Sequence, residues 1–114
     1  LLEVGMFNPK PKPTRFKDQN FSEHIRQRDG FCVAGRMLPR EGERLTDGMF
    51  LWECSAGLDA HHITHRGGGG DDSLENGISL CRRHHQLAHM NVIVRDQMHK
   101  WLEVLYGGKH GREV

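Results

Sequence analysis

Histidine is concentrated in one part of this chain. Of its nine histidines, six lie between positions 61 and 89, and Cys81 lies among them: His61, His62, His65, His84, His85 and His89. Imidazole nitrogens and thiolates are the ligands that zinc and related ions prefer in proteins. Their density in this segment therefore indicates metal chemistry rather than scattered surface histidines.

The segment 81–89 predicts two metal half-sites on one helix. Each residue of a helix advances by about 100° around the axis, so His85 and His89, four positions apart, share one face. This pair could bind a single ion. Cys81 and His84 point about a quarter-turn away and have the Cys-x-x-His spacing of a zinc half-site. We therefore expect two different centres.

The thiolate half-site needs two further ligands. Cys32 and Cys54 are the remaining cysteines, and with Cys81 and His84 they would complete the Cys₃His set of a structural zinc. This assignment rests on counting, because the gap between Cys32 and Cys54 is much longer than in a Cys-x-x-Cys knuckle. The alternative is two ordinary buried cysteines.

The imidazole half-site needs a partner from the segment Asp59–Ile63. Neighbouring residues of a strand point to opposite faces, so His61 and His62 are expected to have different roles. One could bind the metal while the other accepts a proton. The spacing does not decide which histidine does which.

The hydrophobic pattern predicts the elements that would position these residues. We expect a flexible basic arm over 1–18, one domain over 19–107 and a frayed tail over 108–114. Within the domain we expect helices over 20–28, 82–90 and 96–106, strands over 31–33, 49–52 and 58–64, an apolar segment over 78–81, and a loop over 35–48. This is a small α+β domain.

Composition limits the class of protein. Hydrophobic residues make up 36% of the chain, a thin core that a bound metal would help to stabilise. The three cysteines cannot all form disulfides, and no apolar run has the length of a membrane span, so we expect a soluble protein of the reducing cytosol. The net charge of +1 does not by itself indicate a nucleic-acid binder. The basic arm, with Lys10, Lys12, Arg15 and Lys17, could lie along phosphates or be a solvated tail.

The histidine-rich segment resembles the signature of the HNH endonuclease family. The resemblance covers roughly residues 20–90 and is strongest over 59–89. It rests on these sequence segments: Asp59-Ala-His61-His62-Ile63, Arg66-Gly67, Gly69-Gly70-Asp71, Glu75-Asn76, and Leu80-Cys81-Arg82-Arg83-His84-His85 followed by His89. The basic start and the short length are most similar to small HNH proteins of bacteriophages and prophages. In place of two Cys-x-x-Cys knuckles, however, the chain has Cys32-x-x-Gly35 and Cys54-x-x-Gly57.

The resemblance implies a ββα-metal fold with flanking helices and a hydrolytic site. His62 would be the general base, and Asn76 would hold the loop and orient that base. His61, His85 and His89 would bind one catalytic divalent ion (Mg²⁺, Mn²⁺, Ni²⁺ or Zn²⁺), with Asp59 as an alternative ligand. An ordinary imidazole pKa near 6.5 suits a base at neutral pH.

The implied substrate is duplex DNA, with little sequence preference because no recognition helix with clustered Arg, Asn and Gln is evident. Arg66, Arg82 and Arg83 are the candidate phosphate contacts, and His65 is either a loop residue near the phosphate or a surface residue. The resemblance also suggests a bacterial host cytosol and other phage proteins as partners. The alternatives are a non-catalytic zinc-bearing DNA- or protein-binding module, and a hydrolase acting on RNA or another phosphoester.

Overall fold

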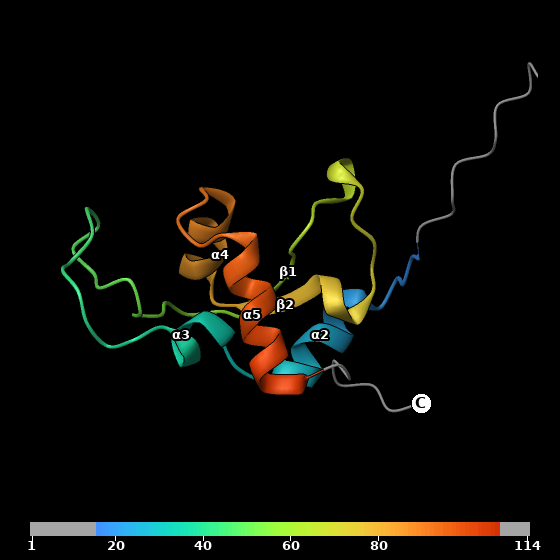
Figure 1. Cartoon of the computed structure of the whole chain (residues 1–114), viewed down its shortest axis with the longest axis horizontal. Coiled ribbons are helices and arrows are strands. Elements are labelled where there is room, and N and C mark those ends of the chain that lie inside the picture. Colours follow the sequence, from blue (N-terminus) through green and yellow to red (C-terminus); the bar gives the residue numbers. More distant parts are fainter. Residues whose placement is uncertain (1–15, 108–114) are drawn as a thin grey trace, which may run out of the picture.

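The centre of the fold is a two-stranded antiparallel sheet (Figure 1). The computed structural model describes residues 16–107. Strand β1 (Asp59–His62) pairs with β2 (Gly77–Leu80), and His61 lies opposite Ile78 in the register. The loop between the strands contains two 3-10 turns, η1 (Arg66–Gly68) and η2 (Leu74–Asn76). The predicted α+β class is confirmed.

Among the described residues, four helices surround this sheet: α2 (Phe21–Asp29), α3 (Val33–Met37), α4 (Arg82–His89) and α5 (Arg95–Tyr106). Helices α2 and α4 each pack against both strands. Helix α4 follows β2 directly, so the chain passes from strand, through loop and strand, into a helix that returns to the sheet (Figure 1). The helices predicted over 20–28, 82–90 and 96–106 are confirmed to within one residue at each end.

The hydrophobic core joins the sheet to the helices. Its fully buried apolar side chains come from α2, α3, β2, α5 and the segments that follow β1 and precede α5: Ile25, Val33, Ile63, Ile78, Leu80, Ile93, Met98 and Leu102. Strand β2 is buried along its whole length, whereas in β1 His61 is buried and the other three residues are partly exposed. The sheet therefore holds one histidine of β1 inside the fold.

Two predicted strands are wrong. Residues 31–33 do not form a strand, because Val33 begins α3 and the Cys32 sulfur caps that helix by accepting a hydrogen bond from the Gly35 N–H. Residues 49–52 form a turn after a single bridge between Arg44 and Phe50.

Only the last residues of the predicted arm over 1–18 are described. Residues 1–15, and the predicted tail over 108–114, lie outside the described residues. Phe16 and Asp18, however, are tied to the loop after β1: the Asp72 N–H donates to the Phe16 carbonyl at 2.9 Å, and the Asp18 N–H donates to the Asp72 carboxylate at 2.8 Å. Phe16 and Asp18 are therefore held against the domain.

Within residues 16–107, every helix is too short or too polar to cross a membrane.

Candidate metal centres

The three-histidine cluster consists of His61 from β1 and His85 and His89 from α4. Their ligand atoms all lie within 4.8 Å of one another. His61 is buried because it points from the sheet toward α4, and its ring centroid lies 5.1 Å from each of the other two rings. The Nε2 atoms of His85 and His89 are 3.2 Å apart. One strand and one helix thus direct three imidazoles at one point.

This geometry fits a bound ion. Bonds of about 2.0–2.1 Å from a tetrahedral zinc to two imidazole nitrogens separate those nitrogens by about 3.3 Å. The observed 3.2 Å between the two Nε2 atoms is close to that separation. Two neutral imidazoles can make such a contact, whereas two imidazolium rings would repel each other.

Asp59 lies behind the cluster rather than in it. Its carboxylate accepts a hydrogen bond from Nδ1 of His85 at 2.9 Å and pairs with Arg82 Nε at 2.9 Å. The hydrogen bond with His85 is the main reason that the pKa of Asp59 is lowered. A carboxylate on the far nitrogen of a ligating histidine fixes the ring and raises its basicity. Asp59 is therefore placed to orient His85, and its prediction as an alternative ligand is not supported by this position.

Two histidines of the cluster, His61 and His89, have a lowered pKa. Burial, followed by the charges of the surrounding histidines His85, His89 and His65, lowers the pKa of His61 to about 3. Burial also lowers the pKa of His89. Only a neutral imidazole has a lone pair for a metal. His61 and His89 thus each have a lone pair available for a metal at neutral pH.

The Cys₃His cluster consists of Cys32, Cys54, Cys81 and His84. Nδ1 of His84 lies 3.3 Å from Cys32 Sγ, 3.7 Å from Cys54 Sγ and 3.2 Å from Cys81 Sγ. Tetrahedral zinc with bonds of about 2.3 Å to sulfur separates sulfur from nitrogen by about 3.5 Å. The four residues thus lie close enough together to bind a metal ion.

The surroundings of the Cys₃His cluster also suit an ion. Nε2 of His84 is 2.7 Å from the Leu51 carbonyl, which leaves the lone pair on Nδ1, facing the sulfurs. Burial and the neighbouring Cys32 raise the pKa of Cys54 to about 12. A metal must therefore displace a proton from this thiol, so the affinity for metal should fall as the pH falls.

Gly35 makes room for the fourth ligand. A β-carbon at position 35 would overlap the Cys54 sulfur, and its next nearest neighbour would be the sulfur of Cys32. The incomplete knuckle Cys32-x-x-Gly35 is thus completed in space by Cys54, which the loop after α3 brings back to the start of that helix.

Comparisons of the chain with models of protein families, with curated proteins and with solved structures found no match.

His62 lies on the opposite side of β1 from the three-histidine cluster. Its ring stacks on Phe21 of α2 at a centroid distance of 4.1 Å, and its Nε2 is 2.8 Å from the Asp72 carboxylate. If Nε2–H donates to Asp72, Nδ1 carries the lone pair and can accept a proton. His61 and His62 thus point to opposite faces of β1, as the period of a strand predicts.

Asp72 is a residue that the sequence did not single out for this site. It is buried and accepts hydrogen bonds from the Asp18 N–H, His62 and Arg66. Although burial acts to raise it, the pKa of Asp72 is held at about 2 by these hydrogen bonds. The sequence has two adjacent carboxylates, Asp71 and Asp72, and only the path of the loop selects the second.

Asn76 closes the loop between the strands. Its side-chain oxygen accepts from the Thr64 N–H at 2.8 Å, and its amide donates to the carbonyls of Thr64 and Asp71 at 3.0 and 2.8 Å. Gly70 allows this closure, because a β-carbon there would overlap the Thr64 carbonyl. The predicted loop-holding position of Asn76 agrees with these contacts.

The three arginines predicted to contact phosphate all have partners within the protein. Arg66 pairs with Asp72 and Arg82 with Asp59, yet both side chains remain more than half exposed. Arg83 is buried, and its guanidinium binds Asp47 and the carbonyls of Leu51 and Glu53. The prediction for Arg83 is therefore corrected: it ties the loop that carries Cys54 to α4.

Proposed function

We propose that this chain is a metal-dependent endonuclease of the HNH type that hydrolyses phosphodiester bonds in DNA. The observation that carries the proposal is the three-histidine cluster on one strand and one helix, with His62 next to His61 on that strand. The order of residues along the chain, His61-His62, then Asn76, then His85, supports it. The proposal includes the assignment of this α+β fold to the ββα-metal type.

The three-histidine cluster would hold the catalytic divalent ion. Such an ion polarises the scissile phosphate and offsets the charge that develops during hydrolysis. Three protein ligands leave coordination positions open, as hydrolytic sites require. Asp59 would keep His85 turned toward the ion through its hydrogen bond to Nδ1.

His62 would act as the general base. Its ring is held flat against Phe21, and Asp72 accepts its Nε2–H, so Nδ1 is the nitrogen that would take the proton of the attacking water. A carboxylate in this position fixes the tautomer of the imidazole and stabilises the imidazolium once it forms. General-base assistance contributes about 10²–10⁴ in rate.

The Cys₃His cluster would hold a structural zinc. A closed set of four ligands leaves no position for substrate. It would tie α3, the loop carrying Cys54 and the start of α4 together, and α4 carries two ligands of the catalytic ion. A bound zinc would thus position the hydrolytic site while taking no part in the reaction.

We further propose that the substrate is duplex DNA bound with weak sequence preference, in the cytosol of a bacterial host and alongside phage proteins. Arg66 is exposed and shares the Asp72 carboxylate with His62. Arg82 is exposed and shares the Asp59 carboxylate with His85. Most contacts that position a protein on DNA are to phosphate, and they carry no sequence information.

Cleavage of supercoiled plasmid tests the proposal. Wild type, His62→Ala and His89→Ala would be compared in the presence of Mg²⁺, Mn²⁺, Ni²⁺ or Zn²⁺, with His99→Ala as the control because His99 is an exposed histidine of α5. We expect wild type and His99→Ala to cut, His62→Ala to lose about 10²–10⁴ in rate while still binding metal, and His89→Ala to lose the catalytic ion.

Other outcomes would overturn parts of the proposal. Equal cutting by wild type and His62→Ala would remove His62 as the base. A protein that binds metal but cleaves no DNA with any of these ions would favour the non-catalytic zinc-bearing binding module. Cleavage of single-stranded RNA but not of plasmid would assign the same site to a ribonuclease.

A further inference from the structure

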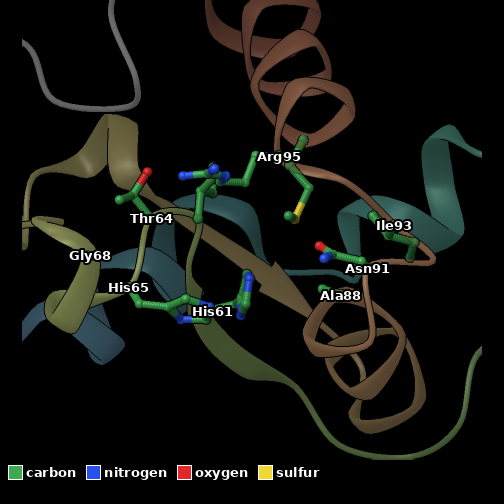
Figure 2. A pocket seen from close by; sticks show the side chains of 10 residues that line it. His61, Thr64, His65, Gly68, Ala88, Asn91, Ile93 and Arg95 are labelled. Carbon is green, nitrogen blue, oxygen red and sulfur yellow. The ribbon is translucent and has the colours of Figure 1, made fainter.

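A pocket of about 330 Å³ lies beside the three-histidine cluster (Figure 2). His61 forms part of its wall, so the pocket and the cluster share a residue. One side is the loop after β1, with Thr64, His65 and Gly68, and the other is the segment from the end of α4 to α5. Its volume is at the lower end of the range of about 300–1,000 Å³ typical of ligand pockets.

The interior and the rim of this pocket differ in chemistry. Ile63, Ile93 and Met98 are buried and give it an apolar interior. Thr64, Asn91 and Arg95 supply polar groups, and Arg95 is the one lining residue with a permanent charge. A site of this kind suits a ligand that has both an apolar body and an anionic group.

Arg95 differs from the other arginines near the cluster. Arg66, Arg82 and Arg83 are each paired with a carboxylate. Among residues 16–107, by contrast, no ion pair joins Arg95 to an acidic side chain, and no carboxylate lines the pocket. Figure 2 shows Arg95 extending from α5 across the pocket toward Thr64.

We propose that this pocket is the subsite for a nucleotide next to the scissile bond, and that Arg95 binds its phosphate. The inference rests on the proposed nuclease function and names the part of the protein that holds the substrate. An arginine presents several donors to phosphate oxygens in a fixed geometry, and a sugar or base can cover the apolar interior. Because His61 belongs to both sites, a nucleotide in the pocket lies next to the reacting phosphate.

Binding of a short fluorescein-labelled DNA duplex tests this subsite apart from catalysis. The experiment uses the His62→Ala chain with metal present, so that DNA is bound but cut slowly. We expect the further change Arg95→Gln to weaken binding about tenfold, the effect of losing a charge-assisted hydrogen bond, and to reduce the slope of log affinity against log salt by about one. The matched control Lys100→Gln removes an exposed charge of α5 that does not line the pocket.

A pair of glycines gives a second test. A β-carbon at Gly67 or at Gly68 has no described atom within 4 Å, so both positions accept a side chain. Gly68 lines the pocket and Gly67 does not. Gly68→Asp would put a carboxylate where the phosphate binds, and we expect it to weaken binding at least as much as Arg95→Gln. Gly67→Asp adds the same charge to the same turn and should have a smaller effect.

The outcomes separate the two proposals. If the chain binds the duplex, and Arg95→Gln and Gly68→Asp bind as tightly as their controls, the subsite is overturned while the nuclease proposal stands. If the chain neither binds the duplex nor cuts plasmid, both proposals are overturned. Weaker binding by Arg95→Gln and Gly68→Asp, but not by their controls, supports the subsite.

Discussion

The Cys54 sulfur occupies the space that a side chain at residue 35 would need, because a β-carbon on Gly35 would overlap that sulfur. The two residues are therefore coupled: the absence of a side chain at one position allows the ligand at the other. A ligand attached to residue 35 would have to replace Cys54, not join it.

Moving the thiol from residue 54 to residue 35 tests this coupling. Loss of a residue that only supports a metal ligand lowers metal affinity by up to about 100-fold. Because Cys54 would be a ligand itself, we expect Cys54→Ala to lower zinc affinity by more than that. The double variant Gly35→Cys/Cys54→Ala should recover most of the lost affinity, because the new sulfur can reach the vacated place. Competition with a chromogenic chelator measures both values.

The single change Gly35→Ala serves as the control for that experiment. It adds the overlapping β-carbon without a ligand, so it should weaken zinc binding while leaving all three cysteines in place. A double variant that binds zinc no better than Cys54→Ala would contradict the shared position.

Removing the charge of Asp72 should slow cleavage. In Asp72→Asn the amide can present its NH₂ to Nε2 of His62, which favours the tautomer with the proton on Nδ1 and leaves no base there. We expect a loss of at least about 100-fold in the rate of plasmid cleavage, the lower range for general-base assistance. Asp71→Asn is the matched control, since the Asp71 side chain contacts Ser73 instead. Equal rates for the two variants would exclude a role for Asp72.

Truncating Asn76 should loosen the loop between the strands. Asn76→Ala removes hydrogen bonds to Thr64 and Asp71 and leaves buried backbone groups without partners. We expect the free energy of unfolding to fall by about 1–3 kcal/mol, measured by urea denaturation. Asn20→Ala is the control, because the Asn20 side chain makes no capping hydrogen bond to α2. A change below about 0.5 kcal/mol for Asn76→Ala would contradict the loop-closing role.

The depressed pKa of His61 predicts loss of stability in acid for the metal-free chain. The unfolded chain protonates His61 near pH 6.5, whereas the folded chain resists protonation until about pH 3. The contribution of His61 to the free energy of unfolding is fully present above pH 6.5 and is lost as the pH falls toward 3. The loss is at most about 1.4 kcal/mol per pH unit for this one group. Urea unfolding at a series of pH values measures the slope.

Comparison with His61→Asn isolates this residue from the other histidines whose pKa is lowered, His84 and His89. We expect a shallower slope for His61→Asn and an unchanged slope for the exposed control His99→Asn. Identical slopes in all three chains would show that His61 takes up its proton equally well in the folded state.

The ligands around α4 were predictable because they lie on or next to one helix: His84, His85 and His89 are in α4, and Cys81 is its N-cap. Their separation around the axis follows from backbone geometry alone, so the split between Cys81 with His84 and His85 with His89 needed no knowledge of the rest of the fold. The helix is observed over Arg82–His89, and the two pairs do face different clusters.

The two strands predicted over 31–33 and 49–52 were wrong for a physical reason. Short apolar runs are compatible with a strand, a buried turn or the first turn of a helix, and tertiary contacts choose among them. At residue 32 the side-chain sulfur caps α3, and near residue 50 the turn is held by the hydrogen bond from the Phe50 N–H to Glu53.

The histidine-rich segment 61–89 shows where local and long-range information divide. The sequence by itself determined the α+β class, the register of ligands along α4, and the separation of His61 from His62, since each follows from the period of a helix or a strand. Only the tertiary structure decided that Cys54 completes Cys32-x-x-Gly35, that Asp72 rather than Asp71 holds His62, and that Arg83 is buried. These are contacts between residues far apart in the chain, and they depend on the path of the loops, which no local periodicity specifies.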